Sequence, residues 1–252
     1  MARAVSPIAD RAIVLVDFEA WTDDGTLFDT TRPEVAKKAG MDPTELKGPL
    51  PVIIGGGRVV AGFEEAIRNA KVGEETEATV GPEQAFGPRS DGLVRTFPMT
   101  EFRKREVMPE PGMRVEMQRR RGTVTHVTAS RVKVDFNHPY AGRTITYKFK
   151  VEKVLEDTED KVRALIDLAF RVGTSDDFSV RLDGGQLTIT PPERLVLDPA
   201  WFLAKHRLAH DVFDHLGVET AVFEDRFTRK GMEAHSHAEH GHGEDAHGHE
   251  EE

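Results

Sequence analysis

The dominant spacing of apolar side chains changes near Asp157, and that change constrains the fold more than any other feature. Before it, apolar and polar residues alternate in short runs separated by Gly, Pro and Asp turn signals, which is typical of β-strands. After it, apolar residues recur at helical spacing. We therefore expect an α+β protein in which a new domain begins after the last strand of the first part.

Strand signals dominate the first part of the chain. Ile13 to Trp21 is rich in β-branched residues, and Asp23-Asp24-Gly25 is a hairpin turn signal that leads into a second short strand over Thr26 to Asp29. Arg32 to Pro51 is rich in Pro, Gly and charge, which predicts a loop inserted between strands. The other elements expected here are short helices over 34–39 and 62–69 and strands over 75–80 and 145–154.

Helix signals dominate after residue 157, and the clearest belong to the last predicted helix. Asp198 is its N-cap, Pro199 takes the first helical position and Gly217 follows its end. Its apolar side chains at helical spacing are Trp201, Leu208, Val212, Phe213 and Leu216. The other elements expected here are a helix over 160–171, a hairpin over 178–189 that turns at 183–185, and a final strand over 220–223.

Charge is unevenly distributed along the 252 residues, whose formal net charge is -10. Residues 233–252 hold six Glu and one Asp without Lys or Arg, and their composition predicts a disordered tail. Residues 89–138 are instead basic, with eleven Lys or Arg against six Asp or Glu. Alternating runs predict that this basic segment is a small all-β module, with strands over 113–117, 123–128 and 131–136.

Three motifs follow one another in the first part of the chain. Val16 to Asp29 ends in the dipeptide Phe28-Asp29, Gly57-Arg58-Val59-Val60-Ala61-Gly62-Phe63-Glu64 comes next, and Ala85-Phe86-Gly87 completes the set. In this order the motifs resemble those of the FKBP family of peptidyl-prolyl isomerases, and the resemblance covers residues 11–156. Any one of these phenylalanines alone would be an ordinary core residue of a sheet. The ordered set instead favours the family.

The chemistry that this resemblance implies needs no nucleophile and no cofactor. An X-Pro bond rotates over a barrier of about 18–20 kcal/mol because the amide loses its resonance, and a dry apolar pocket can favour the twisted amide. The family places Phe63 at the pocket floor, the Val60 N–H against a substrate carbonyl and Asp29 at the rim. Phe18 and Phe86 stand where the family usually has tyrosine, so two hydroxyls are missing and we expect modest activity. The implied walls are Phe18, Phe28, Leu50, Val59, Val60, Phe63, Phe86 and Phe149.

The basic module lies between Phe86 and the stretch Asn137-His138-Pro139-Tyr140-Ala141-Gly142, where SlyD-like and long archaeal FKBPs carry an insert-in-flap domain. In those relatives the insert binds unfolded polypeptide, so the resemblance implies chaperone activity, and basic charge would favour acidic clients. Nucleic-acid binding through Arg119 to Arg121 is disfavoured, because no aromatic residue interleaves with the arginines and the net charge is negative. Four apolar side chains would contact clients if exposed, or else fill the small core: Phe102, Met108, Met113 and Met117.

The tail is rich in histidine, and imidazoles on a flexible chain can bind nickel, zinc or copper ions. Such spacing also resembles the metal-binding tails of SlyD-like proteins. The alternative is a solubilising acidic tail that chelates metal only incidentally. His206 and His210, four apart on the last predicted helix, lack the glutamate of a metalloprotease helix and are expected at the surface. The predicted metal ligands are His235, His237, His240, His242, His247 and His249.

Composition narrows the protein class further. Cysteine is absent, which excludes disulfides, a thiolate nucleophile and cysteine-based metal sites. No run of about 18 apolar residues occurs, and the first residues lack the apolar region and cleavage pattern of a secretory signal. We therefore expect a soluble cytoplasmic protein without membrane contact.

The sequence thus predicts an α+β fold: an FKBP-type antiparallel sheet wrapped on a short helix, an inserted small all-β domain and a C-terminal α+β domain. Its predicted function is peptidyl-prolyl isomerisation in unfolded or partly folded proline-containing polypeptides. A ligand of the FK506 type and a homodimer through the C-terminal domain are further candidates. The alternative is a holdase chaperone or a nickel- or zinc-binding protein with a degenerate pocket. The predicted boundaries are 1–88 and 139–156 for the isomerase domain, 89–138 for the insert, 157–232 for the C-terminal domain and 233–252 for the tail.

Overall fold

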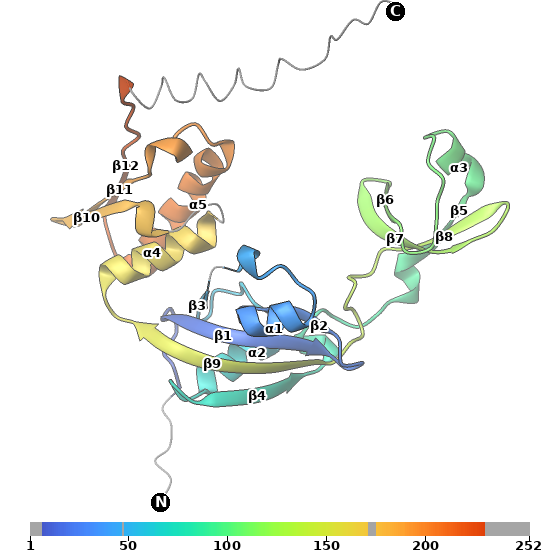
Figure 1. Cartoon of the computed structure of the whole chain (residues 1–252), viewed down its shortest axis with the longest axis horizontal. Coiled ribbons are helices and arrows are strands. Elements are labelled where there is room, and N and C mark those ends of the chain that lie inside the picture. Colours follow the sequence, from blue (N-terminus) through green and yellow to red (C-terminus); the bar gives the residue numbers. More distant parts are fainter. Residues whose placement is uncertain (1–6, 47, 171–174, 230–252) are drawn as a thin grey trace, which may run out of the picture. The chain divides into compact units, whose positions relative to one another are not determined.

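The computed structural model describes residues 7–46, 48–170 and 175–229. Its helices and strands are labelled in Figure 1. The α+β class is confirmed, because three sheets and five α-helices make up the regular structure of the described residues. Backbone packing divides the described residues into two compact units. The first comprises those within 7–9, 16–50 and 54–152, and the second those within 10–15, 51–53 and 153–229.

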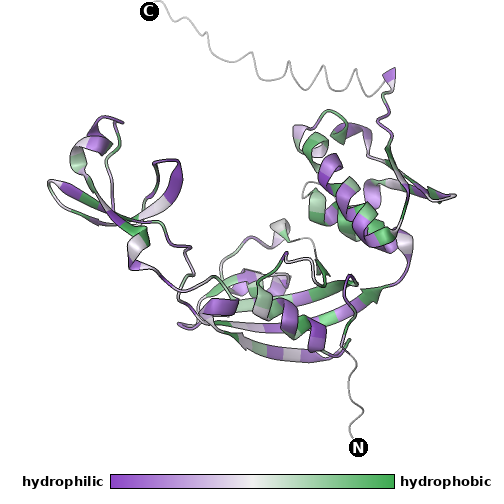
Figure 2. Ribbon diagram, turned by 180° about the vertical axis from the view of Figure 1, so that it is seen from behind, coloured by the Kyte–Doolittle hydropathy of each residue, from purple (hydrophilic) through white to green (hydrophobic). Residues whose placement is uncertain are grey.

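The largest sheet is mainly antiparallel, as predicted for the first part of the chain. Its strand order is β2 (Leu27–Thr30), β1 (Ile13–Thr22), β9 (Ile145–Leu155) and β4 (Glu75–Val80), and β3 (Leu50–Ile53) also pairs with β1. The hairpin between β1 and β2 is confirmed, and its turn uses Gly25 at φ +80°. The loop that follows carries the short helix α1 (Pro33–Lys38). Figure 2 shows the alternation of this sheet as bands of both colours.

The helix α2 (Ala61–Asn69) lies close to β4 because of one glycine. Gly62 is buried, and a Cβ atom built on it would lie 2.4 Å from a methyl carbon of Val80. Any side chain at this position would therefore push the helix away from the strand. Phe63 and Ile67 lie on the same buried face of α2, so this close approach directs Phe63 into the interior.

The basic segment folds as a four-stranded antiparallel sheet, in the order β5 (Val94–Pro98), β8 (Arg131–Asp135), β7 (Arg120–Val127) and β6 (Arg114–Met117). A short helix, α3 (Met99–Arg103), covers one face of it. Neither β5 nor α3 was predicted, since five residues are too few to show a helical period. The core of this insert consists of Phe97, Phe102, Met117, Val124, Val132, Val134 and Phe136.

The four apolar side chains of the insert divide between its core and its surface. Phe102 and Met117 are buried, so the hypothesis that they face clients is wrong for these two. Met108 and Met113 are 79% and 40% exposed and remain available for apolar contact. Sequence alternation could not separate the pairs, because the covering helix α3 itself was not visible in the sequence.

The stretch of chain that enters the insert and the stretch that leaves it are joined by hydrogen bonds and an ion pair. The Ser90 N–H donates to Asn137 Oδ1 at 2.9 Å, and Asn137 Nδ2 donates back to the Ser90 carbonyl at 3.0 Å. Asp135 accepts a further hydrogen bond from Asn137 and forms an ion pair with Arg89. Gly142, at φ +79°, donates its N–H to the Gly87 carbonyl. We call the two stretches that make these contacts, residues 87–90 and 135–142, the neck of the insert.

The second unit is a small α+β structure, as predicted. β10 (Ser179–Asp183) and β11 (Gln186–Thr190) form the expected hairpin, and β12 (Thr220–Phe223) pairs in parallel with β11. Two helices, α4 (Thr158–Ala169) and α5 (Pro199–Leu216), pack on each other. The described residues also form short 3-10 helices at Pro43–Glu45, Pro82–Gln84, Asp91–Leu93, Ser175–Asp177 and Glu193–Leu195.

The ends of α5 are those that the sequence predicted. Asp198 accepts a hydrogen bond from the Ala200 N–H at 2.7 Å, and Gly217 adopts the left-handed conformation at φ +64°. Trp201, the largest fully buried side chain, anchors the helix in the core. Phe213 was predicted on the same face but is 44% exposed, because it lies beyond the edge of the stripe that the core covers.

Candidate active site

Four aromatic rings pack together where α2 faces the large sheet. Phe63 is 2% exposed and stacks on Tyr147 of β9, with ring centroids 4.0 Å apart and planes 6° apart. Phe149, two residues along β9, meets Phe63 edge-on at 5.3 Å. Phe18 of β1 lies 5.5 Å from Phe63 and 6.4 Å from Tyr147. We call Phe18, Phe63, Tyr147 and Phe149 the inner cluster.

A second group of rings is more accessible to solvent. Phe28 of β2 lies 4.3 Å from Tyr140 and 5.9 Å from Phe86. Phe86 stacks on His138, with centroids 4.5 Å apart and planes 6° apart. Phe28, Phe86 and Tyr140 are half-buried, and His138 is exposed. We call these four residues the outer cluster.

The nine residues that the resemblance assigned to the pocket occupy three kinds of position. Five are phenylalanines of the inner and outer clusters. Asp29, next to Phe28 on β2, is exposed. Leu50 begins β3, and Val59 and Val60 precede α2; all three are half-buried.

The backbone around Phe18 and Val60 is held by local hydrogen bonds. The Phe18 N–H donates to Thr31 Oγ1 at 2.8 Å, and Thr30 Oγ1 donates to the Phe18 carbonyl at 2.7 Å. Val60 caps α2 in an extended conformation, and its carbonyl accepts the N–H groups of Phe63 and Glu64. Both bonds fix where the helix starts, and with it the direction of the Phe63 ring.

Tyr147 brings a polar group into the inner cluster. Burial raises the pKa of Tyr147 to about 12, and the negative charge of Asp29 raises it as well. The phenol is therefore neutral at physiological pH and keeps its O–H as a donor. The charge of Asp29, which is exposed on β2, thus acts on a ring of the inner cluster.

Three ring residues of the site were missed by the sequence reasoning: Tyr147, Tyr140 and His138. Tyr147 could have been found, because it shares the inward face of β9 with Ile145 and Phe149 at period two. Tyr140 and His138 lie in a loop without periodicity, so only the fold could place them. Two tyrosine hydroxyls are thus present in the clusters, although Phe18 and Phe86 carry none.

The two clusters consist mainly of apolar rings, which can pack against another apolar ring. Within the described residues, no group of three or more His, Asp or Glu side chains is placed to hold a metal ion. The predicted metal ligands, from His235 to His249, lie outside the described residues. No helix among the residues that the structure describes is both long and apolar enough to cross a membrane.

Comparison with known proteins decides the family. A family model for FKBP-type peptidyl-prolyl cis-trans isomerase matches residues 6–98, one for the FKBP26 IF domain matches residues 95–140, and one for the FKBP26 C-terminal domain matches residues 158–228. The short-type peptidyl-prolyl cis-trans isomerase of Methanocaldococcus jannaschii is 34% identical over 132 residues, which are 52% of this chain and 84% of that protein. The chain belongs to the FKBP-type peptidyl-prolyl cis-trans isomerases.

Two SlyD proteins are also similar to this FKBP. SlyD of Treponema pallidum is 31% identical over 172 residues, which cover 67% of this chain and 88% of that protein. SlyD of Helicobacter pylori is 33% identical over 129 residues, 49% of this chain and 69% of its own length. The predicted identity as a SlyD-like FKBP with peptidyl-prolyl isomerase activity is confirmed, and the family acts on proline-containing polypeptides without a cofactor.

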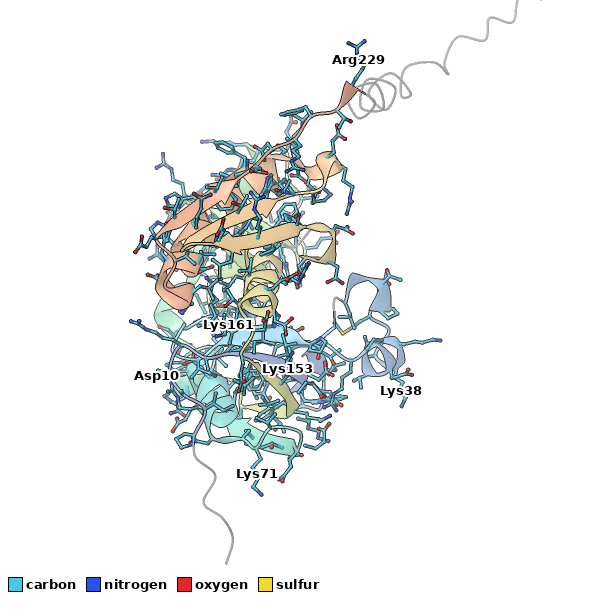
Figure 3. All side chains as sticks on the ribbon, turned by 90° about the vertical axis from the view of Figure 1, so that its left-hand side faces the viewer. Asp10, Lys38, Lys71, Lys153, Lys161 and Arg229 are labelled. Atoms are coloured by element: carbon cyan, nitrogen blue, oxygen red, sulfur yellow. The ribbon has the colours of Figure 1, made fainter. Side chains whose placement is uncertain are left out.

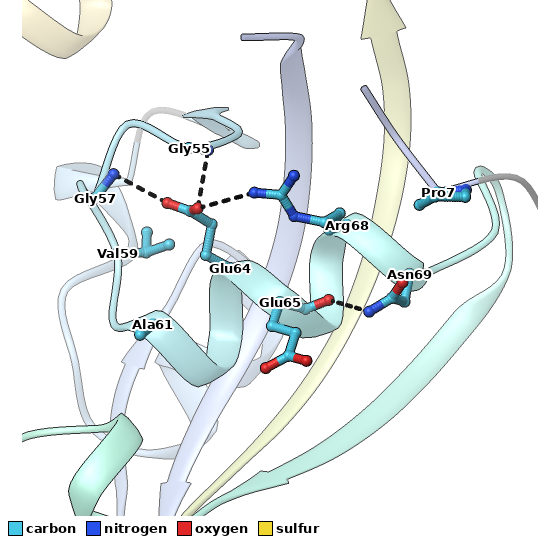
Figure 4. Close-up of a pocket in the computed structure, with 9 residues that line it drawn as sticks. All are labelled: Pro7, Gly55, Gly57, Val59, Ala61, Glu64, Glu65, Arg68 and Asn69. Atoms are coloured by element: carbon cyan, nitrogen blue, oxygen red, sulfur yellow. Dashed lines mark hydrogen bonds and ion pairs between the residues drawn. The ribbon is translucent and has the colours of Figure 1, made fainter. Parts of the chain in front are cut away.

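In this FKBP the loop before α2 is tied to the helix by one carboxylate. Glu64 accepts the N–H groups of Gly55 at 2.9 Å and Gly57 at 3.0 Å, and Arg68 lies 3.6 Å from it (Figure 4). The loop leads directly into Val59 and Val60. A hollow of about 830 Å³ lies beside it, lined by Pro7, Gly55, Gly57, Val59, Ala61, Glu64, Glu65, Arg68 and Asn69.

Glu64→Gln is expected to loosen this loop without emptying the core. The neutral amide offers one acceptor oxygen where the carboxylate offered two, so one glycine N–H loses its partner. We expect the free energy of unfolding to fall by about 1–2 kcal/mol, and kcat/KM for a proline peptide to fall about three- to tenfold, mainly through KM. Urea unfolding and a peptide isomerisation assay measure the two effects.

Glu65→Gln is the matched control. Glu65 is exposed on the next position of α2, and Figure 4 shows its carboxylate pointing away from the loop. It should change neither quantity. Equal losses in both variants would mean that helix charge, and not the loop bonds, explains the Glu64 result.

Proposed function

We propose that the inner and outer clusters together form the prolyl site of this FKBP. The observation that carries the proposal is the position of Phe63, a buried ring at the start of α2 with aromatic neighbours on both central strands. Phe63 serves as the floor, the Val60 N–H binds a substrate carbonyl, and Asp29 lies at the rim. The walls are Phe18, Phe28, Leu50, Val59, Val60, Phe86 and Phe149, to which we add Tyr140 and Tyr147.

The test is the rate of isomerisation by the full chain in two substrates, a short proline peptide and a protein whose refolding is limited by proline isomerisation. We expect both to be accelerated, because binding the ring in a dry pocket favours the twisted amide. Acceleration of neither would favour the alternative of a holdase or metal-binding protein with a degenerate pocket. If the prolyl site is active, a ligand of the FK506 type, which we place in the same site, should compete with the peptide.

We also propose that the insert binds unfolded polypeptide and so acts as a chaperone module. Met108 and Met113 support this, since both are exposed and methionine adapts to varied apolar partners. A second site on the same chain raises the effective concentration of client prolines at the pocket. The proposed module is the segment 89–138, flanked by the isomerase segments 1–88 and 139–156.

Gly122→Ala is expected to separate the two activities. A Cβ atom on Gly122 would lie 2.7 Å from a Val134 methyl, 2.8 Å from the Phe136 ring and 2.9 Å from the Asp135 carbonyl oxygen, so the sheet of the insert must shift. We expect the insert to lose about 1–3 kcal/mol of stability. Peptide isomerisation should stay within about twofold of wild type, while acceleration of protein refolding falls about tenfold or more. Parallel loss in both assays would contradict a separate role for the insert.

For the second unit, proposed to be a C-terminal domain over 157–232, we propose homodimerisation through α5. Phe202 and Leu203 are 73% and 72% exposed, and Phe213 lies further along the exposed side of the same helix. Exposed apolar residues gathered on one helix favour a protein partner. Sedimentation of wild type and of Phe202→Asp tests this: a dimer should become a monomer.

For the tail, 233–252, we propose weak binding of nickel or zinc by its six histidines. Imidazole is a suitable ligand for both ions. Calorimetric titration of the full chain with each ion, with and without the six histidines changed to serine, tests this. The cytoplasmic location stays a prediction from the sequence.

A further inference from the structure

The sheet of the insert has one covered face and one face that no described element covers. Its inner face packs on the core around Phe102 and Val132. On β8, Val132 and Val134 point inward, so Arg131 and Lys133 point to the other side, where they are exposed. We call this second side the outer face of the insert.

The strand register places His126, Arg121 and Arg114 on the outer face as well. His126 of β7 lies opposite Lys133, and Arg121 lies opposite Glu116 of β6. Arg114 stands two residues before Glu116, on the same side of β6. Two carboxylates belong to this face: Glu116, and Asp135, which Arg89 already engages. The exposed cations are Arg114, Arg121, Arg131 and Lys133.

Among the described residues, the side chains of these four cations have no ion-pair or hydrogen-bond partner, and the same holds for Arg103, Lys104 and Arg119 elsewhere in the insert. Three arginines of the insert do have contacts: Arg95 donates to Gln118, Arg105 donates to the Glu116 carbonyl, and Arg120 lies over the Phe136 ring. Unpaired charges of one sign on an uncovered sheet create a local positive potential in a chain of net charge -10.

We propose that the outer face of the insert binds acidic segments of unfolded polypeptide, so that this FKBP prefers clients whose prolines lie near Asp and Glu. The inference rests on the proposed chaperone role of the insert. Charge complementarity selects the occupant, because four cations without internal partners match a row of carboxylates.

A nucleic acid would also be attracted to cations, but the outer face does not suit one. No large aromatic side chain is exposed on the insert, so bases would find no ring on which to stack. The chain as a whole is strongly negative and would repel a long polyanion. A short acidic peptide segment experiences mainly the local field, since salt screens charges beyond about 8–10 Å.

The experiment compares two peptides with the same Ala-Pro bond, one followed by a run of Glu and Asp and one by a run of Ser and Gly. For the full chain in about 20 mM salt we expect kcat/KM to be about tenfold higher for the acidic peptide, mainly through a lower KM. In about 500 mM salt the ratio should fall towards one.

The test variant changes Arg114, Arg121, Arg131 and Lys133 to glutamine in the full chain. It should turn over the neutral peptide as wild type does and lose the preference for the acidic one. The control variant changes Lys37, Lys38, Lys71 and Lys148 to glutamine; these residues are exposed, and Figure 3 shows Lys38 and Lys71 projecting outward. It has the same net charge as the test variant and should keep the preference.

Failure of this inference is distinguishable from failure of the proposed function. No turnover of the neutral peptide would contradict the prolyl site itself. Two results would overturn only the proposal that the outer face binds acidic segments. One is normal turnover of the neutral peptide without a preference for the acidic peptide. The other is a preference that the test and control variants both keep or both lose. If the full chain bound a single-stranded oligonucleotide more tightly than an acidic peptide of equal charge, the outer face would be a nucleic-acid site and not a site for acidic polypeptide.

Discussion

Phe63→Ala is expected to lower kcat/KM for peptide isomerisation by at least about a hundredfold, equivalent to about 2.7 kcal/mol of transition-state stabilisation. The alanine removes the ring that stacks on Tyr147 and contacts Phe18 and Phe149, so water can enter where the proline ring would lie. Loss of a buried phenylalanine should also lower the free energy of unfolding by about 3–5 kcal/mol. A coupled peptide assay and urea unfolding measure the two effects.

Because Phe63→Ala could unfold the domain, Phe63→Leu is needed beside it. Leucine keeps the site apolar and filled, so the chain should fold and retain about a tenth of its activity. Phe178→Leu is the matched control, since Phe178 is equally buried in the core of the second unit. It should lower stability and leave kcat/KM unchanged. Full activity of Phe63→Ala with an intact fold would show that the prolyl site lies elsewhere.

Tyr147→Phe is expected to reduce activity about three- to tenfold and to remove one part of the pH dependence of stability. The folded-state pKa of Tyr147 is about 12, above its ordinary value near 10, first because of burial and then because of Asp29. Folding therefore favours the protonated phenol. The associated stability is complete below about pH 10 and is lost as the pH rises towards 12, by about 2–3 kcal/mol in all.

The measurement is the difference in free energy of unfolding between wild type and Tyr147→Phe at several values of pH from 8 to about 12. All other groups titrate in both proteins, so their contributions to the free energy of unfolding cancel in this difference. It should be constant up to about pH 10 and then decline. Tyr140→Phe is the control, because Tyr140 is half-buried in the outer cluster. A pH-independent difference for Tyr147→Phe would mean that burial does not restrain its ionisation.

Local signals in the sequence were sufficient for much of the fold. The hairpin at Gly25 and the ends of α5 at Asp198 and Gly217 depend on the conformations that single residues prefer, so they could be predicted without tertiary contacts. The motif around Phe63 likewise predicted α2 and its buried ring. These are the positions where backbone preference and hydrophobic pattern agree.

The sequence could not show which side chains meet across elements. Met117 and Met113 have the same chemistry and similar surroundings in the sequence, yet α3 covers one of them and leaves the other 40% exposed. The rings of Phe18 and Tyr147 bring β1 and β9 together across more than a hundred residues. Such contacts are decided by tertiary packing, which overrides local preference.

The neck of the insert has a consequence for the order of folding. β4 and β9 must pair although residues 81–144 separate them, which makes their contact slow to form. The insert consists largely of neighbouring strands, so it can form early from local contacts. Once Ser90 and Asn137 have met, the loop still to be closed shrinks to about a quarter of its length, which removes about 1 kcal/mol of closure entropy. The insert would thus bring together the two halves of the sheet that it interrupts, and act as a folding nucleus for its own host domain.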